Sequence, residues 1–257
     1  MTEPATGFYD ALSPFYHDNM GWDWDSVMRD EGTLLSDFLD QQMSNGGLYA
    51  ILDCACGIGT QAIGLALHGH RVHGTDLSPV SVDCARSQAE RLGVDMTFEI
   101  ADFRHLGETV SGRFDVVMAC DNSIAHCLED DDLVAAVASM KSRLLSEGLL
   151  VLSVRDYDAL VEDRPQFNNE HVQNRQDGRR VVFQVWDWEK DGSGYLMHQF
   201  LLRETDAGYE TNHFQTKLRA LRRDQLTVAL ESAEYRDIGW HPPHETGYYQ
   251  PIVTARP

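Results

Sequence analysis

The sequence predicts an α/β fold in which helices cover both faces of a doubly wound, mostly parallel sheet. Two observations support this prediction. Short apolar runs suited to buried strands alternate with segments of helical periodicity between residues 46 and 158. A glycine-containing loop also follows the first apolar run and comes directly before a predicted helix. In such a fold, ligands are expected at the carboxyl ends of the strands.

The elements of this first part can be placed in order. They are a strand at 49–54, a helix at 60–68, a strand at 71–76, a helix at 79–92, strands at 96–101 and 114–120, a helix at 131–145 and a strand at 149–154. Pro79 suits the first turn of its helix and Gly93 its end. The apolar run at 116–119 is typical of a central parallel strand. Gly148 is predicted to cap the helix before the fifth strand.

The pattern changes after residue 158. Successive strands are predicted at 180–186, 195–203 and 209–221, separated by turn signals at 190–192 and 206–208. They indicate an antiparallel β insertion over the site. The chain then divides into an N-terminal lid and helix (1–45), a core (46–158), the insertion (159–222) and a C-terminal part that completes the core (223–257).

Composition narrows the class of protein. A chain of 257 residues with 42% hydrophobic residues can bury a full core in one elaborated domain. The net charge of −20 disfavours a nucleic-acid partner, which requires a basic face, and weakly favours approach of cations. Nowhere do 18 apolar residues occur together, so no membrane span is expected.

The cysteines and the first residues indicate the compartment. Five cysteines are an odd number, and most lie in apolar runs where a thiol behaves as a small hydrophobic group. The start Met-Thr-Glu-Pro shows no basic flank followed by an apolar run, so no export leader is expected. We therefore expect a reducing, cytoplasmic setting.

The loop after the first strand reads Asp53-Cys54-Ala55-Cys56-Gly57-Ile58-Gly59-Thr60. Its glycines let a ligand approach the backbone beside a helix amino terminus. Asp76 ends the second strand at the offset of about 20 residues where an acidic side chain binds ribose hydroxyls. The third glycine of the dinucleotide fingerprint is absent, since Ala62 and Ile63 occupy that stretch. A cofactor with ribose but no pyrophosphate therefore fits better than a pyridine dinucleotide, although a nucleotide-dependent oxidoreductase remains an alternative.

The segment 51–59, Ile-Leu-Asp-Cys-Ala-Cys-Gly-Ile-Gly, resembles the first motif of class I S-adenosylmethionine-dependent methyltransferases. The resemblance implies a Rossmann-like fold with S-adenosylmethionine as cofactor. It also implies that Asp76, followed by Leu77, binds ribose and that Asp102 and Phe103 lie at the adenine. Taken singly, Asp76 could instead cap a helix and Asp102 could be a turn residue.

A narrower resemblance lies between Cys120 and Asp158. The segment Asp121-Asn122-Ser123-Ile124-Ala125-His126 resembles Gly-Asn-Ser-Phe-Ala-His of the glycine N-methyltransferase and glycine/sarcosine methyltransferase group, and Val154-Arg155-Asp156-Tyr157-Asp158 resembles its His-Arg-Asn-Tyr-Asp. The resemblance implies that Asn122 lies beside an amino acid substrate and that Arg155 pairs with its carboxylate. Tyr157, or a tyrosine of the N-terminal lid, is then expected to accept a hydrogen bond from the amine. Asp121 departs from the group's glycine and could favour a second positive group.

Physical arguments and alternatives accompany these roles. A guanidinium suits a carboxylate because it offers a rigid fork of donors, and Arg155 follows an apolar strand. The alternatives are a salt bridge from Arg155 to Asp156 or Asp158, and a turn role for Asn122.

Further cofactor contacts are expected before the first strand. Aromatic side chains attract a sulfonium, and the resemblance places an arginine near the cofactor's carboxylate. The complete set of expected cofactor residues is Asp53, Gly57, Gly59, Asp76, Leu77, Asp102, Phe103, Arg29, Tyr16, Trp22 and Cys120.

The function expected from the sequence is in-line transfer of a methyl group to the nitrogen of a small, carboxylate-bearing amine. Methylation of oxygen or carbon, and a non-catalytic S-adenosylmethionine-binding module, are the alternatives. No metal is expected, because the four histidines of the insertion and tail show no metal-ligand spacing (His198, His213, His241 and His244). The sequence leaves the acceptor and the oligomeric state open, a homo-oligomer included.

Overall fold

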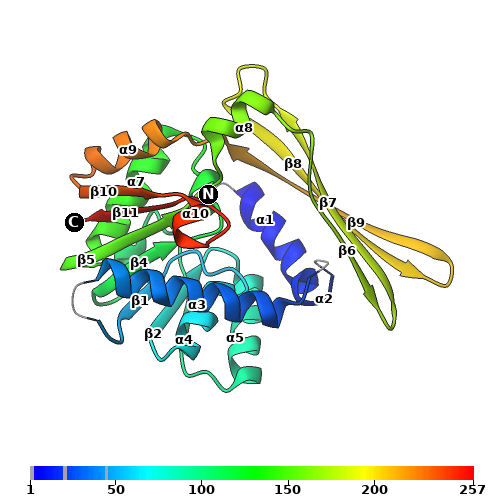
Figure 1. The fold of residues 1–257 in the computed structure, drawn as a ribbon, viewed down its shortest axis with the longest axis horizontal. Coiled ribbons are helices and arrows are strands. Elements are labelled where there is room, and N and C mark those ends of the chain that lie inside the picture. The colour runs from blue at the N-terminus through cyan, green and yellow to red at the C-terminus, as the bar shows by residue number, and fades with distance from the viewer. Residues whose placement is uncertain (1–2, 20–21, 44–45) are drawn as a thin grey trace.

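The computed structural model describes residues 3–19, 22–43 and 46–257, which form two sheets (Figure 1). The larger sheet has the strand order β10-β11-β5-β4-β1-β2-β3. Its strands are β1 (Ala50–Asp53), β2 (Arg71–Asp76), β3 (Thr97–Ile100), β4 (Phe114–Ala119), β5 (Leu144–Ser153), β10 (Arg236–His241) and β11 (Ile252–Arg256). The first five are parallel, β11 runs antiparallel to β5, and β10 runs antiparallel to β11. The expected doubly wound, mostly parallel sheet is confirmed.

Helices cover both faces of this sheet. They are α3 (Trp24–Gln42), α4 (Thr60–Leu67), α5 (Pro79–Leu92), α6 (Leu106–Thr109), α7 (Asp130–Ser142), α9 (Arg223–Ser232) and α10 (Pro243–Thr246). Successive residues of a strand face opposite sides, so Ile51 packs with the α3 and α4 side chains while Leu52 packs with those of α7 and α9. Burial on both faces explains why the central strands are almost entirely apolar.

Helices α3 and α4 touch at their backbones. A Cβ atom added to Gly32 would lie 2.5 Å from the backbone of Gly64. This contact holds α3 directly against the helix that follows the glycine loop. It brings the neighbouring side chains Glu31 and Gln61 together across the two helices.

A smaller antiparallel sheet has the order β6-β7-β8-β9. Its strands are β6 (Phe167–Arg175), β7 (Gly178–Trp188), β8 (Gly194–Thr205) and β9 (Gly208–Arg219), and α8 (Tyr157–Asp163) connects it to β5. The N-terminal α1 (Glu3–Leu12) lies between the two sheets, followed by the short helices η1 (Ser13–Phe15) and α2 (Tyr16–Asn19) (Figure 1). None of the described helices combines the length and the apolar character needed to cross a bilayer.

Two local predictions differ from the structure. Gly148 does not cap a helix but lies inside β5, where an added Cβ would meet the carbonyl oxygens of Leu145 and Asp115 at 2.9 and 3.1 Å. Strand β6 was not predicted, because its residues are mostly polar and exposed and show no alternation. It is an edge strand held by pairing with β7.

Candidate active site

The glycine loop connects β1 to α4. Gly57 and Gly59 both have positive φ (52° and 92°), which glycine adopts without strain. At Gly59 an added Cβ would lie 2.7 Å from Ile63, so the position requires glycine for packing as well. At Gly57 an added Cβ would meet open space. A ligand can therefore approach the backbone of Gly57 closely.

Asp76 stands at the carboxyl end of β2, beside this loop. Its carboxylate accepts hydrogen bonds from the backbone N–H groups of Gly57 and Ser78, both at 2.9 Å. Burial raises the pKa of Asp76, and these N–H groups counteract the shift by stabilising the anion. A carboxylate offers about four acceptor positions. Asp76 can thus organise the loop and still accept hydrogen bonds from ribose hydroxyls.

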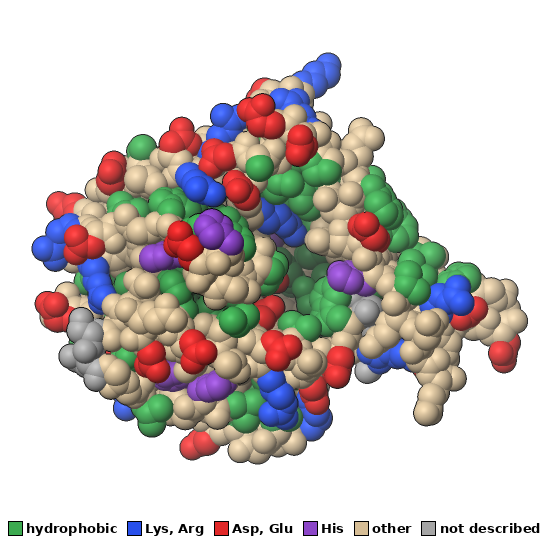
Figure 2. All heavy atoms as spheres, in the orientation of Figure 1, with side chains coloured by type: hydrophobic (Ala, Val, Ile, Leu, Met, Phe, Trp, Pro, Cys, Tyr) green, Lys and Arg blue, Asp and Glu red, His purple; other side chains and the backbone are tan. Residues whose placement is uncertain are grey.

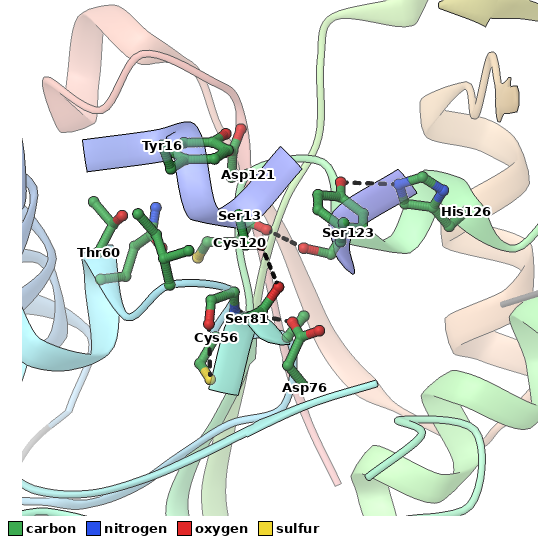
Figure 3. Close-up of a pocket in the computed structure, with 15 residues that line it drawn as sticks. Ser13, Tyr16, Cys56, Thr60, Asp76, Ser81, Cys120, Asp121, Ser123 and His126 are labelled. Carbon is green, nitrogen blue, oxygen red and sulfur yellow. Dashed lines mark hydrogen bonds between the residues drawn. The ribbon is translucent and has the colours of Figure 1, made fainter. Parts of the chain in front are cut away.

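A cleft of about 80 Å³ lies over the loop, beneath α1 and η1 (Figure 3). The residues that line it are Tyr9, Ser13, Tyr16, Ala55, Cys56, Gly57, Ile58, Thr60, Gln61, Asp76, Ser81, Cys120, Asp121, Ser123 and His126. Ser13 and Ser81 are hydrogen-bonded at 2.7 Å, and Tyr9 and His126 at 3.0 Å. Burial lowers the pKa of His126 to about 3, so its imidazole is neutral. Backbone, hydroxyl and carboxylate groups therefore surround a compact polar cleft at the glycine loop.

A second cavity, of about 670 Å³, adjoins the cleft and lies between the core and the smaller sheet. Figure 2 shows the molecule hollowed here, with apolar and charged side chains around the opening. Tyr16, Thr60, Gln61 and Asp121 line both spaces. The two spaces therefore meet at these four residues.

Arg155 follows β5 and lines this larger cavity. Its Nη1 donates a hydrogen bond to the Tyr195 hydroxyl at 2.7 Å, and its guanidinium carbon lies 4.9 Å from the centre of the Trp186 ring. The alternative of a salt bridge to its neighbours is wrong, because Asp156 and Asp158 pair with Arg223 at 3.3 and 3.6 Å. Across the described ranges, no carboxylate lies within ion-pair distance of Arg155.

Asn122 and Tyr157 form hydrogen bonds that support the backbone of Arg155 and its partner Tyr195. The Asn122 side chain donates to the Tyr157 hydroxyl at 2.9 Å and accepts from the backbone N–H of Arg155 at 3.1 Å. The Tyr157 hydroxyl also lies 3.0 Å from that of Tyr195. Asn122 and Tyr157 are 3% and 1% exposed and line neither space. The sequence predicted that both side chains contact the acceptor. In the structure, the protein's own groups occupy their polar atoms, and neither side chain reaches the cavity. They position Arg155 and Tyr195.

The other expected cofactor residues divide into two groups. Tyr16 and Cys120 line the cleft with Gly57 and Asp76, whereas Trp22 lines the larger cavity. Asp53, Gly59, Leu77, Asp102, Phe103 and Arg29 line neither space. Asp53 is fully buried and accepts from the backbone of Ala55 at 3.3 Å, which shapes the glycine loop from below.

Three of these positions have a clear physical explanation. Asp102 is bound by Arg104, which also pairs with Asp132 at 2.8 Å. Phe103 is 1% exposed within the core. Arg29 lies on the exposed side of α3. The structure thus does not bring the predicted adenine contacts, or the predicted arginine for the cofactor's carboxylate, to the cleft.

Sequence reasoning missed several residues of the larger cavity. Glu31 of α3 faces it and accepts a hydrogen bond from Gln61 at 2.7 Å. Trp186, Gln184 and Gln199 come from the smaller sheet, where the alternation of β7 and β8 was the available signal for their inward direction. Glu31 gave no such signal, because an acidic residue on a helix is usually solvated.

His198 and His213 of the smaller sheet line neither space, whereas His171 of β6 lines the larger cavity. His198 contacts His213 and Asp187 at 2.9 and 3.0 Å. Within the described residues, no group of three or more ligating side chains is arranged to hold a metal ion.

The fold, the glycine loop and the acidic residue at the end of β2 define a nucleotide-cofactor site of the Rossmann-like kind. Residues 51–148 match the family model described as a methyltransferase domain. The chain is accordingly an S-adenosylmethionine-dependent methyltransferase. It is 28% identical over 238 residues to a glycine/sarcosine N-methyltransferase from Halorhodospira halochloris, covering 84% of this chain and 85% of that protein.

Solved structures agree in fold. An S-adenosylmethionine-dependent methyltransferase from Clostridium acetobutylicum superposes with a TM-score of 0.72 at 15% identity, covering 96% of this chain and 97% of the other. An amino pentose methyltransferase from Micromonospora echinaspora, solved with S-adenosylmethionine bound, gives 0.73 at 19% identity and covers 97% and 96%. Both likenesses extend over nearly the whole chain, so the smaller sheet is part of the shared fold.

Proposed function

We propose that this enzyme methylates the nitrogen of a small amine that also carries a carboxylate, such as an amino acid. The observation that supports this proposal is Arg155, a cation that faces the larger cavity and has no carboxylate partner among the described residues. A desolvated guanidinium requires an anionic partner or several acceptors. A substrate carboxylate supplies that partner.

The relatives that match most of this chain support nitrogen as the acceptor atom, whereas ubiquinone biosynthesis O-methyltransferases match less than half of it. The similar protein from Halorhodospira halochloris is named a glycine/sarcosine N-methyltransferase. The residues of the present site suit such a substrate, because Arg155 stands in the same cavity as the carboxylates of Glu31 and Asp121. A zwitterion can satisfy both signs of charge in one cavity.

The residues of this chain would act chiefly by positioning. The loop at Gly57 and the carboxylate of Asp76 hold the cofactor, which supplies an activated methyl group when bound. Arg155, fixed by Tyr195 and Trp186, holds the acceptor's carboxylate. Tyr16, at the junction of the two spaces, excludes water beside the transferred group. Holding the nucleophile and the methyl group in line speeds the reaction, because the entropy of alignment is lost on binding and not in the transfer step.

The test compares acids with their amides. We would measure kcat/KM on glycine, sarcosine and other amino acids and on the matching amides, for the wild type, Arg155→Ala and Arg155→Lys. Truncating one partner of a desolvated charge pair costs about 2–5 kcal/mol, so the alanine variant should lose that much on acids and little on amides. Lysine should recover only part of the loss, because an ammonium lacks the planar fork.

Arg223 provides a matched control. Its guanidinium also lies over an indole, 5.5 Å from the centre of the Trp240 ring, but Arg223 does not line the cavity and pairs with Asp156 and Asp158. Arg223→Ala should therefore leave the preference for acids unchanged. Equal losses of Arg155→Ala on acids and amides would mean that Arg155 is structural, and the carboxylate-bearing substrate would be abandoned.

A further inference from the structure

The junction between the two spaces fixes where methyl transfer must occur. The cofactor site is the cleft at Gly57 and Asp76, and under the proposed function the acceptor lies in the larger cavity with Arg155. The methyl group passes from one space to the other, so the acceptor nitrogen must lie where they meet. The side chains there are Tyr16, Thr60, Gln61 and Asp121.

Two carboxylates lie at this junction or next to it. Asp121 lines both spaces directly. Glu31 lines the larger one and is joined to the junction through Gln61, whose amide donates to Glu31 Oε2 at 2.7 Å. The Thr60 hydroxyl is already engaged, because it accepts from the Trp24 indole at 2.9 Å. The acidic groups are therefore the ones suited to an ammonium ion at this point.

We propose that Asp121 holds the acceptor's ammonium group at the junction and that Glu31 is the general base that removes its proton before methyl transfer. This inference rests on the proposed function, because only an amine acceptor needs such a step. An ammonium ion has no lone pair to offer to a methyl group. Aliphatic amines such as the lysine side chain, with a pKa of about 10.4, keep their proton at neutral pH.

The surroundings separate the roles of the two carboxylates. Asp121 accepts hydrogen bonds from the Tyr249 hydroxyl and from the Gln250 amide at 3.4 Å, and Arg155 lies near enough to stabilise its charge. Burial raises the pKa of Asp121, while these three groups lower it. Asp121 therefore remains suited to pairing with a cation.

No cation among the described residues contributes to the pKa of Glu31. Its pKa is raised to about 8, first by burial and then by the charge of Asp121, while hydrogen bonds from Gln61 and Tyr248 counteract part of the shift. The other titratable groups that face it from neighbouring elements are Tyr16, Cys120 and Tyr249. A base works best when its pKa is near the operating pH. Carboxylates whose environments push their pKa values apart commonly divide binding and proton transfer in this way.

The proposed step balances as follows. The N–H bond of the acceptor ammonium breaks, its electron pair stays on nitrogen, and the proton forms an O–H bond with Glu31. The neutral amine then uses that pair to bond the methyl carbon, and the pair of the breaking carbon–sulfur bond stays on sulfur. The charge moves from the sulfonium to the methylated nitrogen. Glu31 releases its proton to water between turnovers.

The test is the pH profile of kcat/KM for the wild type, Glu31→Gln and Glu31→Asp on an amino acid that the wild type methylates. General base catalysis contributes about 10²–10⁴-fold, so Glu31→Gln should lose about 100-fold or more near pH 7.5. The loss should shrink as pH rises, because the amine then loses its proton in solution. Asp30→Asn is the matched control, since Asp30 is the adjacent, exposed acid of α3.

Asp121→Asn tests the second role. Asn tolerates the positive φ of 53° at this position, so the fold should survive the change. Its KM for the amino acid should rise, and the limb of its pH profile that Glu31 controls should move to lower pH, because the charge of Asp121 raises the pKa of Glu31. Binding of S-adenosylhomocysteine to Glu31→Gln should stay within about threefold of wild type, because Glu31 does not line the cleft.

The outcomes are distinguishable. A loss in Glu31→Gln that is constant across pH, or an equal loss of S-adenosylhomocysteine binding, would overturn the base assignment while leaving the amine substrate intact. A wild-type enzyme that methylates none of the amines but does methylate hydroxyl acceptors would overturn both the proposed function and this inference.

Discussion

Asp76 offers the most direct test of how the glycine loop and cofactor site depend on each other. The change is Asp76→Ala, which removes the acceptor of two backbone N–H groups, those of Gly57 and Ser78. Leaving a buried donor unpaired costs about 1–3 kcal/mol, so two such donors cost about 2–6 kcal/mol. Burial raises the pKa of Asp76, so removing the carboxylate also relieves a desolvation cost. We therefore expect a net loss of about 2–4 kcal/mol in the free energy of unfolding.

The assay combines thermal unfolding with calorimetric binding of S-adenosylhomocysteine. For a chain of this length, each kcal/mol lowers Tm by about 2–4 °C, which gives about 4–16 °C for Asp76→Ala. Asp76→Asn keeps one acceptor oxygen and should lose about half as much. Asp83→Ala is the control, because Asp83 is an exposed residue of the neighbouring helix that pairs with the exposed Arg86.

Two results would refute this reasoning. If Asp76→Ala lost cofactor binding but kept the wild-type Tm, the N–H groups of Gly57 and Ser78 would not depend on the carboxylate. If Tm fell as expected but binding in the folded range was unchanged, Asp76 would support the loop without touching the cofactor.

Two further predictions concern stability. Glu31 has a folded pKa of about 8 against an ordinary value of 4.5, so its contribution to stability is fully present below about 4.5 and is lost as pH rises through about 8. Glu31→Gln should therefore raise Tm relative to wild type at pH 9 but not at pH 4, and parallel pH dependences in the two proteins would contradict a buried, high-pKa carboxylate. Gly32→Ala places a Cβ atom 2.5 Å from the Gly64 backbone and should cost about 1–3 kcal/mol by forcing α3 and α4 apart. Gly107→Ala, where a Cβ would meet open space, is its control in the same unfolding measurement.

The sequence was most informative where local chemistry decides structure. The helix at Pro79–Leu92, with proline in its first turn and Gly93 at its end, was predicted with its observed bounds, because both residues act through backbone geometry alone. The strand at Arg71–Asp76 was likewise predicted with its observed bounds. These elements place Asp76 at the cleft.

It was least informative where tertiary contacts decide. Asp102 satisfied the expected pattern for an adenine contact, but its pairing with Arg104 depends on distances that no motif encodes. Arg29 and Glu31 lie two positions apart on α3, about 200° around the helix, so the rotation of α3 about its axis decides which one faces the cavity. That rotation is set by the contact between Gly32 and Gly64, two residues far apart in sequence.

The division of the site between the two sheets separates two kinds of evolutionary change. The residues that line the cleft come from the N-terminal helices and from the helices and loops of the larger sheet, whereas Trp186, Gln184 and Gln199 form the far wall of the larger cavity and come from β7 and β8. Gln184 and Gln199 are hydrogen-bonded to each other at 2.8 Å, and Gln184 also accepts from the Trp186 indole at 2.9 Å. Substitutions in this polar wall can therefore change which acceptors bind, while the residues around the methyl donor stay the same.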